Sequence, residues 1–373
     1  MAVTRVIQYG ESPEQIWDEW LNVAATEAGL GQSTYWARVI QRVDQAQPIF
    51  LSTEIEKKTV GQLLLFHKPP FDRQTRQRIG DRSTLWRDQP DSLEFLDGPV
   101  LNSPENARAV LKDFLKWIEH YALTHGIGVI RSNGFAISSR VSLSPAIGKT
   151  FERFGYKSSK WATLLVDLTD SKENLWRRLD YAARKCIKKC ARAGVIVRKI
   201  VDCQDYADNF QEPYAASKVA QGLTASPLYV QQIMFEEDVK GYNAYFVAES
   251  QDRQVLATLG LYIFNGVATE MASALTPAAH DLKISAQDLL HWEIIKYAKA
   301  NGCHSFNLAG IAPEPGDAKE AGIRRFKQKW GGRYVEYSRY EKVMPGWRAW
   351  NRTRTMAERV AGIGRIVIGR KKR

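Results

Sequence analysis

The pattern of apolar and polar positions along the chain predicts one succession of strands and helices, made twice. In each copy, apolar runs predict a strand pair and a helical period then follows. The first copy covers 60–66, 93–101 and roughly 104–125, and the second covers 254–264, 267–275 and roughly 285–301. A short apolar strand, a turn and a closing strand end each copy. This order predicts an α+β fold with a mostly antiparallel sheet in each half.

The two copies are related by one constant offset in residue number, the repeat spacing. This offset places YALTHG (121–126) on YAKANG (297–302), and it also places Glu94 on Glu270. Several matches at one spacing indicate an internal duplication, with chance similarity as the alternative. We therefore predict two tandem domains, and the domains and the tail that follows them are expected at 1–167, 168–345 and 346–373.

The tail at 346–373 has Trp and small apolar residues at positions that share one side of a helix, with arginines elsewhere. A basic amphipathic helix with Trp is typical of a membrane-surface element. Contact with tRNA phosphates and a disordered tail are the alternatives.

The net charge of +12 lies mainly in two segments. Residues 177–199 and 346–373 each hold nine Lys or Arg against one acidic residue, so the rest of the chain is net negative. A uniform nucleic-acid-binding coat is therefore not expected. The four cysteines have no framework spacing, the start lacks a signal-peptide pattern, and no run reaches about 20 apolar residues. These features predict a soluble cytoplasmic protein, at the inner face of the cell membrane if the tail binds there.

The segment 171–193 has a helical apolar period, and Cys186 and Cys190 fall on the same side as Leu175 and Leu179. Two thiols at this spacing could indicate a metal or redox site. Further ligands at zinc spacing do not occur nearby, and an i, i+4 pair on a helix has poor disulfide geometry. We predict one helix with its thiols packed inward, and we expect no metal.

Two long motifs resemble Fem-type aminoacyltransferases. WATLLVDLTDSKENLWRRLDYAARKCIKKCARAGVIV (161–197) is similar to the segment that opens the second half of these proteins. LLHWEIIKYAKANGCHSFNLAG, followed by GIRRFKQKWGGRYVEY, resembles their closing signature. GQSTYWARVI (31–40) and LDGPVL (96–101) resemble parts of their first half. The resemblance covers about residues 30–345.

This resemblance implies two domains with the GNAT acyltransferase fold. It also implies transfer of an amino acid from aminoacyl-tRNA to an amine on a peptidoglycan precursor, either lipid-linked or nucleotide-linked, without a cofactor. Some members carry a long helical arm in the second domain. The interval between Val219 and Gly241 is too short for one, so we expect the arm-less type. The oligomeric state is left open.

The resemblance also implies the site residues. Lys327 matches the family lysine that stabilises charge at the reacting ester, so Lys327 is the predicted catalytic residue. Arg324, Trp330 and Gly331 are predicted to bind substrate. The alternative is that Phe326 and Trp330 pack while the lysines of this motif face water.

Arg184 and Lys188 are the predicted anchors for a precursor, because charge-assisted hydrogen bonds from a helix face suit pyrophosphate and carboxylate groups. The alternative is a solvated basic face.

Acyl transfer to an amine needs alignment, deprotonation of the amine and stabilisation of an oxyanion. Asp97, Glu270, Asp288 and Glu293 are available carboxylates, and spacing selects none of them. No Gly-x-Ser-x-Gly elbow occurs, so no covalent intermediate is expected. The segment 278–290, where GNAT enzymes hold a pyrophosphate, has no glycine. An acyl-CoA-dependent N-acyltransferase and a non-catalytic module that binds an anionic glycan or RNA are the rival hypotheses.

Overall fold

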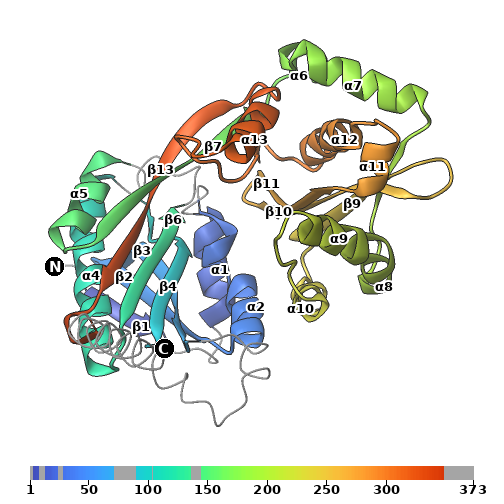
Figure 1. Ribbon diagram of the computed structural model, residues 1–373. Helices are drawn as coiled ribbons and strands as arrows, with labels where there is room; N and C mark the ends of the chain where they lie inside the picture. The colour runs from blue at the N-terminus through green and yellow to red at the C-terminus, as the bar shows by residue number, and fades with distance from the viewer. Residues whose placement is uncertain are drawn as a thin grey trace, which may run out of the picture.

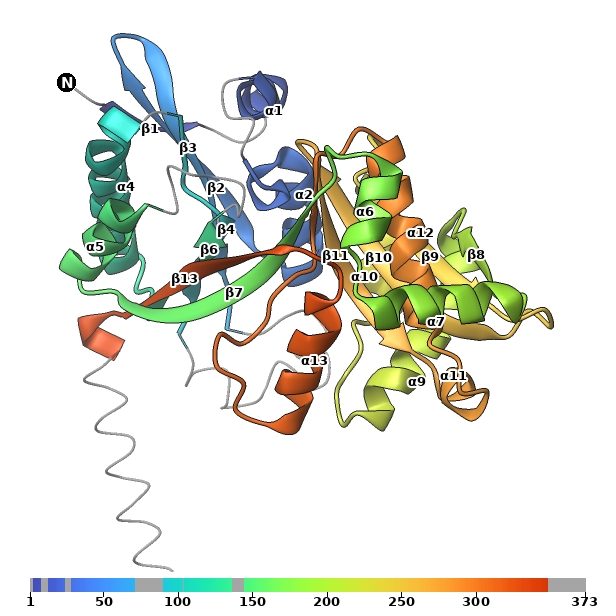
Figure 2. The same ribbon diagram turned by 90° about the horizontal axis from the view of Figure 1, so that it is seen from above.

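The computed structural model describes residues 3–7, 13–23, 28–70, 90–102, 104–135 and 144–347. The predicted tail helix lies outside the described residues from position 348 onward. Two lobes are joined by the long strands β7 (Lys157–Asp167) and β13 (Arg333–Val343), which cross from one lobe to the other (Figures 1 and 2). The fold is therefore bipartite, as the repeat predicts.

The first half begins with a strand and two helices and continues with the sheet and its covering helices. Its elements are β1 (Val3–Ile7), α1 (Pro13–Val23), η1 (Leu30–Gln32), α2 (Thr34–Asp44), β2 (Gln47–Ile55), β3 (Lys58–Lys68), β4 (Ser92–Asp97), β5 (Val100–Leu101), α4 (Pro104–Thr124), β6 (Val129–Phe135), α5 (Pro145–Arg153) and β7.

The second half has more helices ahead of its strands. Its elements are α6 (Lys172–Arg178), α7 (Tyr181–Arg192), β8 (Ile196–Lys199), α8 (Cys203–Tyr206), the π-helix η3 (Ala207–Gln211), α9 (Glu212–Ala220), α10 (Leu228–Glu237), β9 (Asn243–Glu249), β10 (Val255–Phe264), β11 (Val267–Leu275), α11 (Pro277–Asp281), α12 (Ala286–Ala300), β12 (Ser305–Asn307), α13 (Ala318–Gln328) and β13.

One sheet runs through both halves, in the order β1-β2-β3-β4-β6-β13-β7-β12-β11-β10-β9-β8. β7 and β13 pair antiparallel, from Arg333 opposite Leu165 to Glu341 opposite Lys157. The far end of β7 pairs with β12 of the second half, and the far end of β13 pairs with β6 of the first half. The two halves thus exchange their closing strands reciprocally.

The exchange fits the duplication. The repeat spacing carries the bounds of β7 onto those of β13, and it carries the first residue of β6 onto the first residue of β12. Trp161 lies opposite Tyr337, its own equivalent in the repeat, so the pseudo-twofold axis passes between these residues. The predicted boundary after residue 167 coincides with the last residue of β7. Each half's sheet, however, is completed by the other half's closing strand.

Each half has its own apolar core. In the first half α4 and α5 pack on the sheet, and Phe114, Leu115, Ile118 and Phe151 are fully buried. In the second half α7 and α12 pack against each other and on the strands. A third cluster brings α1 and α2 together with α10 and β10, so the halves also meet away from the exchanged strands.

The predicted single helix at 171–193 is wrong in one respect, because it is interrupted. Leu179 has an extended backbone, and Asp180 starts α7 by accepting a hydrogen bond from the amide of Ala182. Asp180 is a strong N-cap residue, which explains the restart at this position. Cys190 is buried and Cys186 is half-buried, and both are free thiols. The inward packing of the thiols is thus complete for Cys190 and partial for Cys186.

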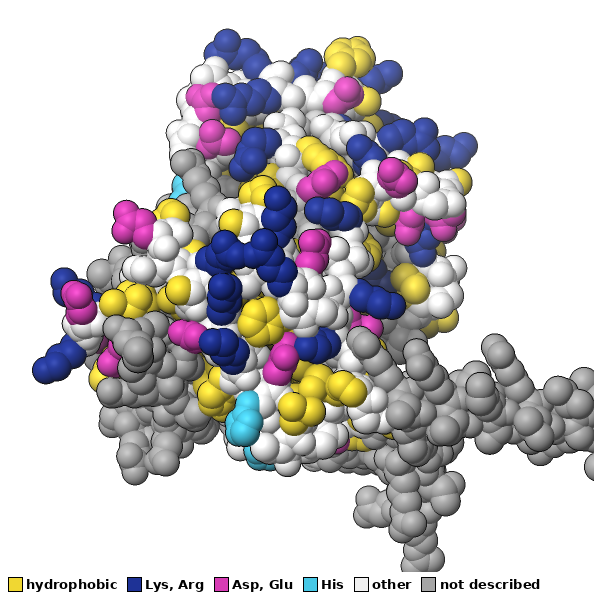
Figure 3. All heavy atoms as spheres, turned by 90° about the vertical axis from the view of Figure 1, so that its left-hand side faces the viewer, with side chains coloured by type: hydrophobic (Ala, Val, Ile, Leu, Met, Phe, Trp, Pro, Cys, Tyr) yellow, Lys and Arg dark blue, Asp and Glu magenta, His cyan; other side chains and the backbone are white. Residues whose placement is uncertain are grey.

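The face that carries α4 and α5 shows a gathering of Lys and Arg side chains near its middle (Figure 3). Exposed basic residues on α5 and the first part of β7 are Lys149, Arg153, Lys157 and Lys160. Basic surface is therefore not confined to the two segments that the charge count singled out.

Candidate functional site

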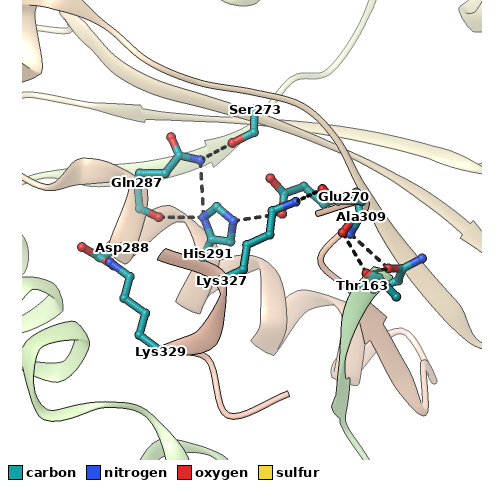
Figure 4. Close-up of polar contacts among 11 residues, drawn as sticks. Thr163, Glu270, Ser273, Gln287, Asp288, His291, Ala309, Lys327 and Lys329 are labelled. Carbon is teal, nitrogen blue, oxygen red and sulfur yellow. Dashed lines mark hydrogen bonds and ion pairs between the residues drawn. The ribbon is translucent and has the colours of Figure 1, made fainter. Parts of the chain in front are cut away.

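Lys327 is buried in the second half. It lies near the end of α13, a helix that starts where Asp317 accepts a hydrogen bond from the amide of Glu320. Its side chain is only 8% exposed, and its Nζ donates to the carbonyl oxygen of Gly310 at 3.2 Å (Figure 4). Buried lysines are rare unless they are paired or functional. The interpretation in which Lys327 faces water is wrong.

Glu270 and His291 share the space beside Lys327 (Figure 4). The His291 Nε2 lies 3.3 Å from a carboxylate oxygen of Glu270, and its Nδ1 lies 2.8 Å from the carbonyl oxygen of Gln287. The side-chain amide nitrogen of Gln287 lies 3.4 Å from the same Nδ1. Both ring nitrogens of His291 are therefore held by polar neighbours.

The charges of this cluster support one another. Burial on its own would raise the pKa of Glu270, but His291 and Lys327 outweigh it and hold that pKa below its usual value. Burial lowers the pKa of Lys327, and Glu270 opposes this change. Because the two groups attract, the ammonium and the carboxylate stabilise each other in a buried site.

The strands around Lys327 diverge. β11 and β12 pair in parallel only from Val267 opposite Ser305 to Thr269 opposite Asn307. Ala309 then has a left-handed backbone, and Ile311 pairs with Ala162 of β7 instead. An alanine with positive φ is strained, and such strain is concentrated at functional sites. Glu270 is the first residue of β11 beyond this pairing, so Glu270 and Lys327 lie at an opening between two parallel strands.

The Trp-Gly-Gly turn after α13 packs under the cluster. Trp330 is 1% exposed and stacks on the His291 ring, with the ring centroids 5.0 Å apart. Lys329 forms an ion pair with the buried carboxylate of Asp288. Gly331 has a φ of 72°, and a Cβ there would lie 3.0 Å from the carbonyl oxygen of Arg178. The turn therefore needs glycine for its backbone, and Trp330 is a packing residue here; binding of substrate by Trp330 and Gly331 stays a prediction.

Arg184 has a structural role in this fold. Its Nη1 donates to the carbonyl oxygens of Leu179 and of Arg177, the latter at 2.9 Å. It therefore satisfies carbonyl groups at the C-terminal end of α6, where a cation is favoured. Lys188 is exposed, and Arg324 donates to the carbonyl oxygen of Pro313 at 2.6 Å. The structure does not bring Arg184 or Lys188 to Lys327, and anchoring of substrate by these residues stays a prediction.

A second group of residues surrounds Asp97 in the first half. Asp97 follows a bulge in β4 and accepts a hydrogen bond from the amide of Gly31 at 3.0 Å. A Cβ on Gly29 would lie 2.3 Å from the Asp97 carboxylate, so any side chain at position 29 would displace that carboxylate. Gln32 fixes the loop, because its side-chain amide bonds the backbone of Leu64 and Leu96.

Burial raises the pKa of Asp97 to about 6, and only the bond from Gly31 lowers it. No cation among the described residues contributes to the environment of this carboxylate. A carboxylate with a pKa close to neutrality can act as a general base at physiological pH. Among the four carboxylates that spacing could not separate, Asp97 is therefore the candidate general base. The glycines at positions 29 and 31, which pass beside it, were the sequence signal that could have pointed to it.

A cavity of about 240 Å³ lies where the two halves meet, and Asp97 is in its wall. Besides Asp97, the only charged residue in the described part of this wall is Arg339. The wall consists of Ala28, Gly29, Leu30, Gly31, Trp36, Leu96, Asp97, Asn133, Leu165, Tyr262, Phe264, Val267, Thr269, Ser305, Asn307, Tyr337 and Arg339.

The cavity and the Lys327 cluster are neighbours. Gly310, which accepts from Lys327, lies close to Tyr337 of the cavity wall: a Cβ on Gly310 would be 3.5 Å from the Tyr337 hydroxyl. Asn307 belongs to the wall as well, and its Oδ1 accepts from Thr163 at 2.6 Å. A molecule bound in the cavity and a second molecule bound at the strand opening could therefore meet around Gly310.

Within the described ranges, no group of three or more His, Cys, Asp or Glu residues has the arrangement of a metal site. The helices of the same ranges include none that is both long and apolar enough to cross a bilayer.

Comparison with known proteins supports the resemblance. The model of the FemAB family matches residues 230–338, a segment that includes Glu270, His291, Lys327 and the Trp-Gly-Gly turn. Among curated proteins, no sequence matches the chain.

Solved structures show the fold. The crystal structure of FemX is 12% identical, with a TM-score of 0.70, and the match covers 91% of this chain and 97% of that one. A tandem GNAT protein from the clavulanic acid biosynthesis pathway is 12% identical, with a TM-score of 0.56 over 92% and 98% of the two chains. L-PGS from Bacillus licheniformis is 13% identical, with a TM-score of 0.53 over 90% and 94%.

The chain thus has the fold of tandem GNAT proteins, and its similarity to the Fem-type family, inferred from sequence motifs, is confirmed in the second half.

Proposed function

We propose that this protein is an aminoacyltransferase that moves an amino acid from aminoacyl-tRNA to an amine of a peptidoglycan precursor. The buried ammonium of Lys327, beside Glu270 at the opening between β11 and β12, carries the proposal. A fixed cation in a site with little water is suited to stabilise the oxyanion that forms when an amine attacks an ester. The FemAB match over this segment supports the same chemistry.

The residues can be given roles in one sequence of steps. The amine of the acceptor lies in the cavity and loses a proton to Asp97, whose pKa of about 6 suits that task. The neutral amine attacks the ester carbonyl of the donor, and Lys327 stabilises the negative oxygen of the tetrahedral intermediate. The intermediate collapses to the amide as the ester C–O bond breaks. The attacking nitrogen gives up its second proton to the departing tRNA oxygen, and Asp97 then releases the first proton to solvent.

The turn after α13 is proposed to contribute to substrate binding through its shape, with Arg324, Trp330 and Gly331. The basic face of α7 is proposed to anchor the precursor, with Arg184 and Lys188. The tail at 346–373 is proposed to bring the enzyme to the membrane surface. Removing it is expected to weaken binding to anionic vesicles.

The experiment is transfer by the purified protein from charged tRNA to lipid II, or to the nucleotide-linked precursor, measured by mass spectrometry. The expected product is the precursor plus the mass of one or more amino-acid residues. Turnover that occurs only with an acyl-CoA would establish the rival N-acyltransferase reaction, and no turnover with either donor would favour a binding module.

A further inference from the structure

We propose that Arg339 binds a carboxylate of the acceptor molecule, in the same cavity that receives the acceptor amine. The inference rests on the proposed function for the identity of the acceptor. Beyond that function, it specifies the chemical group that lies next to the acceptor amine.

Arg339 is held in a fixed orientation without an acidic partner among the described residues. Its guanidinium carbon lies 4.3 Å from the centre of the Trp161 ring, and stacking of this kind fixes the plane of the guanidinium. Its Nε is buried and has no hydrogen-bond partner in the part of the chain that the structure describes. A half-buried guanidinium with an unsatisfied donor is costly, and an acidic ligand would remove that cost.

Asp97 does not supply the missing charge. The two residues share the cavity wall, yet the pKa of Asp97 is raised by burial and no cation of the described chain opposes the rise. Asp97 and Arg339 are therefore not an ion pair. The cavity offers a base on one part of its wall and a fixed cation on another, which matches a ligand with both an amine and an anionic group.

Charge and size favour a carboxylate over a phosphate. Arg339 is the only cation in the described wall, so it balances a single negative charge. The planar fork of a guanidinium matches the two oxygens of a carboxylate. A cavity of about 240 Å³ is smaller than those that enclose whole ligands, so it holds one end of a larger molecule.

The repeat shows that Arg339 is not part of the duplicated framework. Its equivalent at the repeat spacing is Thr163, which is buried and donates to Asn307 and to the carbonyl oxygen of Ala309. One half thus has a satisfied hydroxyl where the other has a guanidinium that reaches the Tyr337 hydroxyl but leaves its own Nε without a partner among the described residues. A framework role would be expected in both halves, whereas a role toward a ligand needs only one.

The test is binding of two acceptor peptides by isothermal titration calorimetry, without any donor. In both peptides the acceptor amine belongs to a 2,6-diaminoheptanedioic acid residue, and the carboxylate on the amine-bearing carbon is either free or amidated. The wild-type protein is expected to bind the free form about 10- to 100-fold more tightly, the usual effect of charge-assisted hydrogen bonds. Arg339→Gln should bring the two affinities within about twofold.

Arg333→Gln is the matched control, because Arg333 is an exposed arginine on the same strand and outside the cavity wall. It should keep the wild-type preference, and Arg339→Lys should keep part of it. Thermal unfolding checks that each variant is folded. A preference that survives in Arg339→Gln, equal wild-type affinities, or displacement of the peptide by inorganic phosphate through Arg339 would overturn the proposal. Because no donor is present, loss of the transfer reaction leaves this result unaffected.

Discussion

The two halves of the molecule place different chemistry at equivalent positions of one fold. In the second half, Lys327 and His291 lie around Glu270. At the same spacing, the first half has Phe151 and Leu115, both fully buried in its apolar core. Polar groups at core positions cost stability unless they are paired. Their presence in one copy only indicates that the second half has been adapted for chemistry at the expense of packing.

The parallel strand pair of each half also differs between the halves. β4 and β6 remain paired as far as Asp97 opposite Phe135, whereas β11 and β12 separate after Thr269. The first half therefore keeps a closed sheet and contributes one carboxylate at its end. The second half opens beside Glu270. We infer that Asp97 of the first half acts on the acceptor in the shared cavity and that the second half activates the donor.

The largest expected effect comes from replacing Lys327 by an apolar residue, as the first half has at the equivalent position, Phe151. Lys327→Met should lower the rate of transfer about 10²- to 10³-fold, since one group that stabilises an oxyanion contributes this much. The rate is measured as single-turnover transfer from charged tRNA. Lys319→Met, on the exposed side of α13, is the control and should leave the rate within about twofold of wild type. An unchanged rate in Lys327→Met would return this lysine to a purely structural role.

Asp97→Asn should lower the rate about 10²-fold and should remove the acid limb of the pH–rate profile near pH 6. The same change should stabilise the fold. The folded-state pKa of Asp97 lies above its unfolded value, so its contribution is favourable at low pH and is lost as the pH rises toward 6.

Replacement of Asp97 by Asn removes that loss, and the free energy of unfolding at pH 7.5 should rise by at most about 3 kcal/mol. Urea unfolding at pH 7.5 and pH 4 separates the two effects, because the gain should be small at pH 4. Lower stability at pH 7.5 would show that the carboxylate is a structural ligand of the 29–31 loop.

The comparison is most direct at the duplicated glutamates. Glu270→Gln should lower the rate about tenfold, because Lys327 loses the charge that opposes the effect of burial on its pKa. Glu94→Gln should have an effect below about twofold, since Glu94 pairs with Lys68 and Arg131 away from the opening. Equal effects of the two changes would contradict the division of roles between the halves.

Much of the fold could be predicted from the sequence, because periodicity and repetition are local properties. The strand pairs, the helices at 104–124 and 286–300 and the closing strands lie where the apolar pattern indicates. The exchange of β7 and β13 could not be predicted, since both strands have the same pattern and nothing local says which half each one completes. The break at Leu179 could have been found from Asp180, which is a good N-cap inside an apparently continuous helix.

The site was predictable in part. The Lys327 motif is contiguous, so its residues are recognisable in the sequence. Asp97 is far in the sequence from Tyr337 and Arg339, which lie on the exchanged strand β13, and the fold brings the two segments to one cavity. The role of Arg184 was hidden for another reason: a long basic side chain that turns back to satisfy helix carbonyls has the same sequence signature as one that faces a ligand.

The smallest effect is expected for Arg184→Met, and it distinguishes a capping role of Arg184 from a role in binding the precursor. If it only caps α6, Arg184→Met should lower the free energy of unfolding by about 1–2 kcal/mol and leave the KM for the acceptor within about twofold. If it also anchors the precursor, KM should rise about tenfold or more as well. Lys188→Met is the matched comparison, because Lys188 is exposed one turn further along the same helix and forms no such cap within the described chain. A rise in KM in both variants would establish α7 as the binding face, whereas a loss of stability in Arg184→Met alone would assign this arginine to the fold and leave recognition of the acceptor to the cavity between the halves.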